Sequence, residues 1–263
     1  MFSYTFMTYA CIVSLFIAVL CPLIGIFLVL RKYSFIGDTL SHASLAGVTI
    51  ALTMSIEPLW GAFLFTAVCG ILIEILRSRF KNNSDLILSV ILTLSVGVAI
   101  TLISSGLARG NAEAFLFGSV LTVSESDIIT VVVLSCIAIL CFVFSYKKLL
   151  FIIVDEDLAQ VAGVKVKTVT YLFSLLVSIT VAVAIKIVGM MVLGSLLTMP
   201  VAAALQFKKG FKMTLILSLV FSLIEVVGGL IFSYYFNFAP GGVIALFSVA
   251  LLILAIFASL LSK

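Results

Sequence analysis

The sequence predicts an all-α integral membrane protein, a polytopic helical bundle of about eight or nine transmembrane helices. The first observation behind this fold class is composition: 64% of the 263 residues are hydrophobic and only 10% are charged, whereas charged residues make up about 25% of a soluble domain. The mean hydropathy is +1.42. The second is that apolar stretches of about 20 residues, enough to cross a hydrocarbon core of about 30 Å, recur along the whole chain.

These apolar stretches predict about nine spans. The sixth and seventh form one continuous run, about 60 Å long as a helix, so the chain is expected to turn back near Lys186 to Gly189. The expected spans are Tyr9 to Leu30, Ile36 to Ile56, Leu59 to Leu76, Leu86 to Ser105, Ile128 to Tyr146, Thr168 to Ile187, Val188 to Phe207, Met213 to Tyr235 and Gly242 to Leu261.

Basic residues indicate the orientation of these spans. In the expected arrangement all of them except Arg109 and Lys186 fall on one side of the membrane, which the positive-inside rule assigns to the cytoplasm. The N-terminus then faces outward and the C-terminus inward. The first span has no positive charge before it, so it is expected to stay in the chain and not to act as a cleaved signal peptide. The net charge of +4 reflects this topology and gives no indication of nucleic-acid binding.

The segments between the spans are too short for a soluble domain, so residues 1–263 are expected to form a single transmembrane domain. The longest are residues 106–127 outside and residues 147–167 inside, each of about 20 residues. In the outer segment, the aromatic residues of FLFGS (115–119) are expected to anchor at the membrane interface. Ser124 or Ser126 is expected to cap the fifth span.

The inner segment predicts a short helix. Asp155 is placed to cap this helix and Gly163 to end it. Two interpretations stay open, a solvated surface helix and a helix that docks a cytoplasmic partner. The acidic residues of its first turn are Glu156 and Asp157, and its apolar stripe consists of Leu158, Val161 and Ala162.

Ionisable residues inside the spans are the main functional candidates, because a charge at the centre of a membrane helix costs about 2.5 to 3.5 kcal/mol. Glu74 lies three residues before Arg77, which predicts an ion pair at the membrane interface. Lys186 is expected to snorkel from the outer end of its helix.

Asp38 and His42 are the most informative of these residues, and His42 is the only histidine in the chain. Their spacing of four residues puts a carboxylate and an imidazole on one helix face, where both can bind a divalent cation. The alternatives are a helix N-cap for Asp38 and a hydrogen-bonded interhelical histidine. Ala43 and Gly47 would let a second helix pack closely, and that helix could belong to another copy of the chain. Two copies would supply two Asp and two His ligands, which suits tetrahedral zinc.

Glu225 lies near the middle of the eighth span and is followed by Gly228 and Gly229, which allow close approach of another backbone. A protonated, hydrogen-bonded structural acid and a role as ligand or gate both stay open. Glu225 lies about 20 Å along its span from the inner side, whereas Asp38 and His42 lie within about two turns of that side. We therefore expect Glu225 to line the path or to stabilise packing, and not to bind the same ion.

The run RKYSFIGDTLSHASLAGV (Arg31 to Val48) resembles the signature of the permease subunits of bacterial zinc and manganese ABC importers, the zinc uptake branch above all. The blocks FLFGSVLTVSESD, VDEDLAQVAGV, VGMMVLGSLLTMPVAAAL and the segment before Pro240-Gly241 fall in the same order as in that family. The resemblance implies that Asp38 and His42 are the pair on the metal path and that Asp155 to Val164 contacts the ATPase. Relatives often carry an acid where this chain has Asn237, which argues against an outer gate that needs a carboxylate there.

The resemblance further implies a homodimeric pore in the bacterial cytoplasmic membrane, with two cytoplasmic ATPase subunits and an extracellular metal-binding protein. The chain itself is expected not to be an enzyme and to bind no cofactor, because it lacks the phosphate-binding GxxxxGK[ST] motif and ATP must bind to a partner. Zn²⁺ is the expected cargo, with manganese or iron as alternatives. A proton-coupled secondary carrier is a further alternative, whereas an intramembrane enzyme is disfavoured because HExxH and GxSxG are absent.

Overall fold

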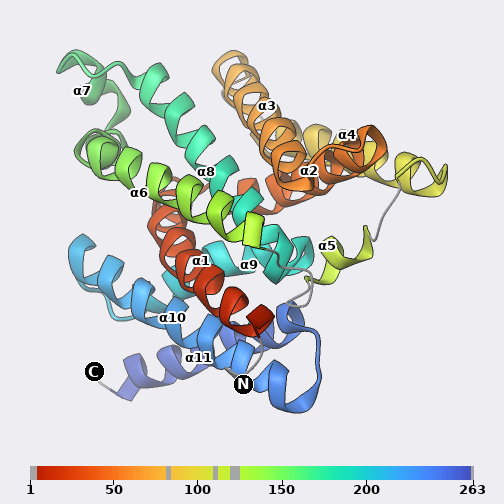
Figure 1. Ribbon diagram of the computed structural model, residues 1–263. Coiled ribbons are helices and arrows are strands. Elements are labelled where there is room, and N and C mark those ends of the chain that lie inside the picture. The colour runs from red at the N-terminus through yellow and green to blue at the C-terminus, as the bar shows by residue number, and fades with distance from the viewer. Residues whose placement is uncertain (1–4, 81–83, 109–111, 119–124, 262–263) are drawn as a thin grey trace. The chain divides into compact units, whose positions relative to one another are not determined.

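The structure, a computed structural model, describes residues 5–80, 84–108, 112–118 and 125–261. All regular secondary structure in these residues is helical (Figure 1), which confirms the expected fold class. Within them, eight helices are long and apolar enough to cross a membrane. These are α1 (Thr5–Leu30), α2 (Ser34–Met54), α3 (Pro58–Arg79), α4 (Ser84–Ser104), α6 (Glu125–Val154), α8 (Val166–Val188), α10 (Phe211–Phe236) and α11 (Pro240–Leu261).

Three shorter helices complete the described chain: α5 (Glu113–Phe117), α7 (Glu156–Val161) and α9 (Met190–Leu205). The 16 residues of α9 span about 24 Å, which is less than the hydrocarbon core of a typical bilayer. The turn expected near Lys186 to Gly189 is confirmed, since α8 ends at Val188 and Gly189 adopts a φ of +80° before α9 begins. All nine expected spans therefore have a helical counterpart, eight of them long enough to span.

One expected span ends well before its helix does. The fifth span was expected to end at Tyr146, but α6 continues to Val154, because the apolar run LLFIIV after Lys147 and Lys148 extends the same helix. The expected inner loop is therefore shorter than residues 147–167. Ser126 lies inside α6 and is not its cap, and Ser124 lies outside the described residues.

The chain forms two compact units, each assembled from separate stretches of sequence. Unit 1 comprises residues 1–34, 113–132 and 184–263, and unit 2 comprises residues 35–112 and 133–183. In unit 1, α1, α9, α10 and α11 pack against one another, and α5 lies against α9 and α11 (Figure 1). Gly25 allows the close contact of α1 with α9, because a Cβ there would overlap the backbone carbonyl of Leu197.

Three glycines form a tight backbone junction in unit 1, where α5 ends, α8 gives way to α9 and α11 begins. Gly118 and Gly189 have φ angles of +77° and +80°, in the left-handed region that favours glycine. A Cβ at Gly118 would overlap the Ile187 carbonyl, and a Cβ at Gly241 would overlap the Val188 carbonyl. We call Gly118, Gly189 and Gly241 the glycine junction; it fixes α5 against the α8–α9 turn.

In unit 2, Gly47 of α2 allows close packing against another helix of the same chain. A Cβ at Gly47 would overlap the carbonyl of Gly61 on α3, so the two backbones touch at this crossing. The close packing expected at Gly47 is confirmed, but the helix that packs there is α3 of the same chain and not a second copy. Gly70 on α3 similarly faces Ser174 and Ser178 of α8.

Candidate metal site and partner-binding helix

Asp38 and His42 lie one turn apart near the start of α2. The helix begins at Ser34, so Asp38 is inside it and the alternative of a helix N-cap is wrong. Both side chains are half-buried, while Ser41 between them is fully buried and donates its hydroxyl to the Gly37 carbonyl at 2.7 Å. Within the described chain, neither Asp38 nor His42 makes a side-chain hydrogen bond or an ion pair. The alternative of a hydrogen-bonded interhelical histidine therefore finds no support there.

This pair offers two ligands of different types on one helix face. A carboxylate oxygen and a neutral imidazole nitrogen both bind zinc, which usually takes four ligands in a tetrahedral arrangement. No group of three or more His, Cys, Asp or Glu side chains that could hold a metal occurs among the residues that the structure describes. Within the described residues, Asp38 and His42 therefore offer two ligand groups, fewer than the four that zinc usually takes.

Glu225 lies in the middle of α10, in unit 1, and its side chain is completely buried. Neither carboxylate oxygen has a hydrogen-bond partner in the described part of the chain, and the same holds for the buried hydroxyl of Ser222 one turn earlier. The alternative of a hydrogen-bonded structural acid therefore finds no support. Burying a carboxylate without a hydrogen-bond partner is energetically costly, so Glu225 remains a candidate functional residue.

The glycines after Glu225 allow close approach of a neighbouring helix, as expected. A Cβ at Gly229 would lie 3.0 Å from the Ile244 Cα on α11, and one at Gly228 would lie 3.1 Å from the Phe247 ring. The helix ends at Phe236, and the next residue, Asn237, caps it with a left-handed φ of +55°. Asparagine is one of the few residues besides glycine that favour this conformation, so a cap of α10 is a structural reason for an amide at this position.

Two other ionisable residues have ordinary structural surroundings. Glu74 and Arg77 form the expected ion pair, with 3.1 Å between the Glu74 Oε1 and the Arg77 nitrogen. Lys186 is half-buried in the last turn of α8, where a cation interacts favourably with the helix dipole. Neither residue adds to the candidate metal site.

The short helix of the inner loop is confirmed, with a cap at each end. The Asp155 carboxylate accepts a hydrogen bond of 2.9 Å from the Leu158 backbone N–H. At the other end, Gly163 has a φ of +86°, and the Val164 N–H donates to the Ala159 carbonyl at 3.0 Å. Glu156 and Asp157 lie in the first turn of α7, near the positive end of the helix dipole, and Ala162 is its C-terminal cap.

The apolar stripe of α7 is exposed. Leu158 and Val161 are 58% and 86% exposed, and only Ala159 of this helix is buried. Apolar side chains that form a contiguous exposed patch often mark a surface that contacts another protein or a membrane. The helix itself was predicted correctly, whereas its docking role stays a prediction.

Two features of the site were missed in the sequence. Ser222 shares a helix face with Glu225, and its position three residues earlier was the signal that could have revealed it. The glycine junction has no comparable local signal, because Gly118, Gly189 and Gly241 are far apart in the sequence.

Related sequences match nearly the whole chain. A protein of Treponema pallidum named "Probable metal transport system membrane protein" is 49% identical over 97% of this chain and 96% of its own length. The high-affinity zinc uptake system membrane protein ZnuB of Haemophilus influenzae is 29% identical over 89% of this chain and 90% of its own length. Relatives named as manganese transport system membrane proteins are 28% and 30% identical.

A solved structure has the same fold. The structure of PsaBC from Streptococcus pneumoniae in complex with Fab superimposes with a TM-score of 0.84 at 28% identity, covering 96% of this chain and 91% of the matched chain. The ABC 3 transport family matches residues 3–259, nearly the full length. Together with the eight candidate membrane helices, this match shows that the chain is a multi-pass membrane protein that belongs to the ABC 3 transport family.

Proposed function

We propose that the chain is the permease subunit of an ATP-driven importer of divalent metal ions in the bacterial cytoplasmic membrane, and that residues 1–263 form its single transmembrane domain. The observation that supports this most directly is the Asp38–His42 pair on α2, which has no partner in the described residues and lies in a chain of a transport family. Asp38 and His42 bind the ion in transit, and Glu225 lines the path without entering the same coordination shell.

Zn²⁺ is the proposed cargo. An imidazole ligand suits zinc, and divalent affinities at nitrogen and oxygen sites favour it over Mn²⁺. The relatives named for zinc and for manganese have similar identity to this chain, so manganese is the second candidate. Metal analysis of the binding protein that delivers the ion tests this choice, because selectivity in such systems depends on geometry and supply as well as on affinity.

The proposed assembly contains two copies of the chain, two cytoplasmic ATPase subunits and an extracellular metal-binding protein. The exposed Leu158 and Val161 of α7 are the proposed ATPase contact, with Asp155 and Gly163 holding the helix in shape. This assignment places α7 and the C-terminus in the cytoplasm and the N-terminus outside, in agreement with the positive-inside rule.

Zinc uptake into proteoliposomes tests the function. Vesicles that contain the purified chain and its co-purifying ATPase are expected to accumulate zinc only with ATP. Buried unpaired acids such as Glu225 also serve proton coupling in secondary carriers, which makes a proton-coupled carrier the second candidate. Uptake by the chain alone, driven by a proton gradient without ATP, would establish that alternative and exclude the importer.

A further inference from the structure

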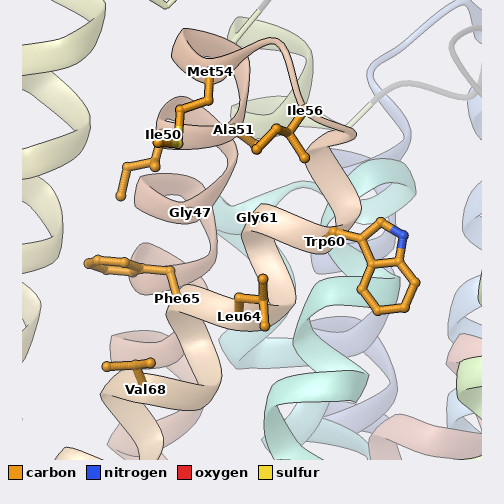
Figure 2. Close-up of a pocket in the computed structure, with 10 residues that line it drawn as sticks. All are labelled: Gly47, Ile50, Ala51, Met54, Ile56, Trp60, Gly61, Leu64, Phe65 and Val68. Carbon is orange, nitrogen blue, oxygen red and sulfur yellow. The ribbon is translucent and has the colours of Figure 1, made fainter.

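An apolar groove lies between α2 and α3, within unit 2. Its volume is about 270 Å³, and the contact of Gly47 with Gly61 forms part of its wall. Figure 2 shows Ile50 and Met54 of α2 on one side of Gly61 and the indole of Trp60 on the other. The larger side chains that line it are Ile50, Met54, Ile56, Trp60, Leu64, Phe65 and Val68.

The chemistry of this lining excludes a polar ligand. Apart from the indole N–H of Trp60 and the weakly accepting thioether of Met54, the side chains that line the groove carry no hydrogen-bonding group, so the groove offers little to a hard metal ion or a hydrophilic molecule. Met54, Leu64 and Val68 are 65%, 59% and 62% exposed. Trp60, Leu64 and Val68 follow one another at four-residue spacing along α3, over about 12 Å.

Both walls of the groove are helices long and apolar enough to cross a membrane, so hydrocarbon is the medium that the groove meets wherever no protein covers it. Lipid tails are as apolar as leucine, and a void that no atom fills loses dispersion contacts. A flexible acyl chain can enter such a groove along the Trp60–Val68 line. Tryptophan is enriched where the membrane meets water, which puts the Trp60 end of the groove at the level of the lipid headgroups.

The charges at this end select the headgroup. Glu57 directly precedes α3 and is exposed, and its side chain makes no capping hydrogen bond. No Lys or Arg occurs anywhere between Ile36 and Leu76. An anionic headgroup would therefore meet a carboxylate and no cation from α2 or α3, whereas an ammonium group would be attracted.

We propose that this groove binds one acyl chain of a phospholipid whose headgroup carries an ammonium group, as in phosphatidylethanolamine, and that Glu57 contacts this ammonium. The site is separate from Asp38 and His42 and does not depend on the proposed cargo.

Trp60 is the only tryptophan of the chain, so its fluorescence reports on the groove directly. The full chain is reconstituted in bilayers of equal parts phosphatidylethanolamine and phosphatidylglycerol, with brominated, quenching acyl chains on only one of the two lipids. Quenching is expected to be stronger with brominated phosphatidylethanolamine, corresponding to a preference of about twofold to fivefold, as an exposed ion pair provides. Glu57→Gln should remove this preference.

A pair of matched variants separates the groove from the general lipid boundary. Val68→Phe fills the end of the groove away from Glu57 and should lower the preference, whereas Val90→Phe, at a site 53% exposed on α4 and outside the groove, should leave it unchanged. Equal quenching by both lipids in the wild type would overturn the proposal. So would the absence of any quenching, which would mean that protein, such as a second copy, covers the groove. If Val68→Phe does not fold, the comparison of the two lipids in the wild type and in Glu57→Gln still tests the proposed lipid preference.

Discussion

The candidate functional residues of the two units differ in how deeply they are buried. In unit 2, Asp38 and His42 are half-buried, and Leu158 and Val161 of α7 are exposed, so these groups are available to an ion or to another protein. In unit 1, Glu225 is completely buried, and close helix packing at Gly229 accompanies it. We infer that unit 2 contains residues that bind and unit 1 contains a residue whose position depends on packing.

The surroundings of α2 and α10 explain how each tolerates its ionisable residues. α2 is the less apolar of the two helices and most of its residues are buried, whereas α10 is more apolar and most of its residues are exposed. A helix shielded by protein can carry polar residues on more than one face. A helix that is mostly exposed can carry a carboxylate only on its protein-facing side, where Glu225 lies.

The largest expected effect is at the α2 pair. His42→Ala should lower metal uptake by at least about 100-fold, because even residues that only support a ligand contribute about 10- to 100-fold to metal affinity. Asp38→Asn should act similarly, since the amide keeps the size and loses the charge. The measurement is uptake of labelled zinc by metal-depleted cells, with expression and dimerisation checked on the same samples.

A control on the same helix sharpens this test. Thr53 is also half-buried on α2, but its hydroxyl donates to the Thr49 carbonyl at 2.8 Å, so it is already satisfied within the helix. Thr53→Ala should keep uptake close to that of the wild type. Normal uptake by His42→Ala would remove the proposed metal site from unit 2.

The sequence predicted those features of both units that depend on neighbours within about four residues. The cap by Asp155, the stop at Gly163 and the Glu74–Arg77 pair all depend on such short spacings, and each is confirmed. Periodicity and length also predicted the helices and the break at Gly189.

Features that depend on distant parts of the chain could not be predicted. The end of α6 was misplaced because Lys147 and Lys148 mark the edge of an apolar span but do not stop a helix. Gly47 packs against Gly61, but the sequence alone gave no reason to choose Gly61 over the other glycines of the chain as its contact. The lack of a hydrogen-bond partner for Glu225 depends on which side chains surround it, and helical periodicity gives no information on that.

The second expected effect concerns the exposed helix of unit 2. Replacing Leu158 and Val161 together by Glu should lower the affinity for the ATPase by about tenfold or more, because buried apolar anchors of an interface contribute over 1 kcal/mol each. Co-purification of the ATPase with the tagged chain measures this. Gln160→Glu adds a charge to an exposed position of the same helix without removing an apolar group, and it should retain the ATPase. If both variants retain it, α7 is a solvated surface helix.

The third effect tests the division of roles between α2 and α10. Glu225→Gln keeps a polar group of the same size and removes the charge, so it should slow transport by about tenfold, or about 1.4 kcal/mol of barrier, while equilibrium metal binding changes little. Single-turnover uptake and metal binding are measured on the same preparation. A loss of bound metal as complete as with His42→Ala would put Glu225 in the coordination shell and contradict the proposed roles.

The last expected effect is on stability and not on transport, and it separates two contributions to the glycine junction of unit 1. Gly106 and Gly118 both have positive φ angles, +68° and +77°, so alanine at either position should cost about 1–2 kcal/mol of backbone strain. A Cβ at Gly106 meets no atom within 4 Å, whereas a Cβ at Gly118 would overlap the Ile187 carbonyl. Gly118→Ala should therefore destabilise the chain by roughly 1–3 kcal/mol more than Gly106→Ala, the usual cost of overpacking. The midpoint of thermal unfolding of the purified chain in detergent measures both variants under the same conditions. Equal midpoints would show that the glycine junction accommodates the added methyl group without loss of stability. The backbone contact of α5 with the α8–α9 turn would then not contribute to the stability of unit 1.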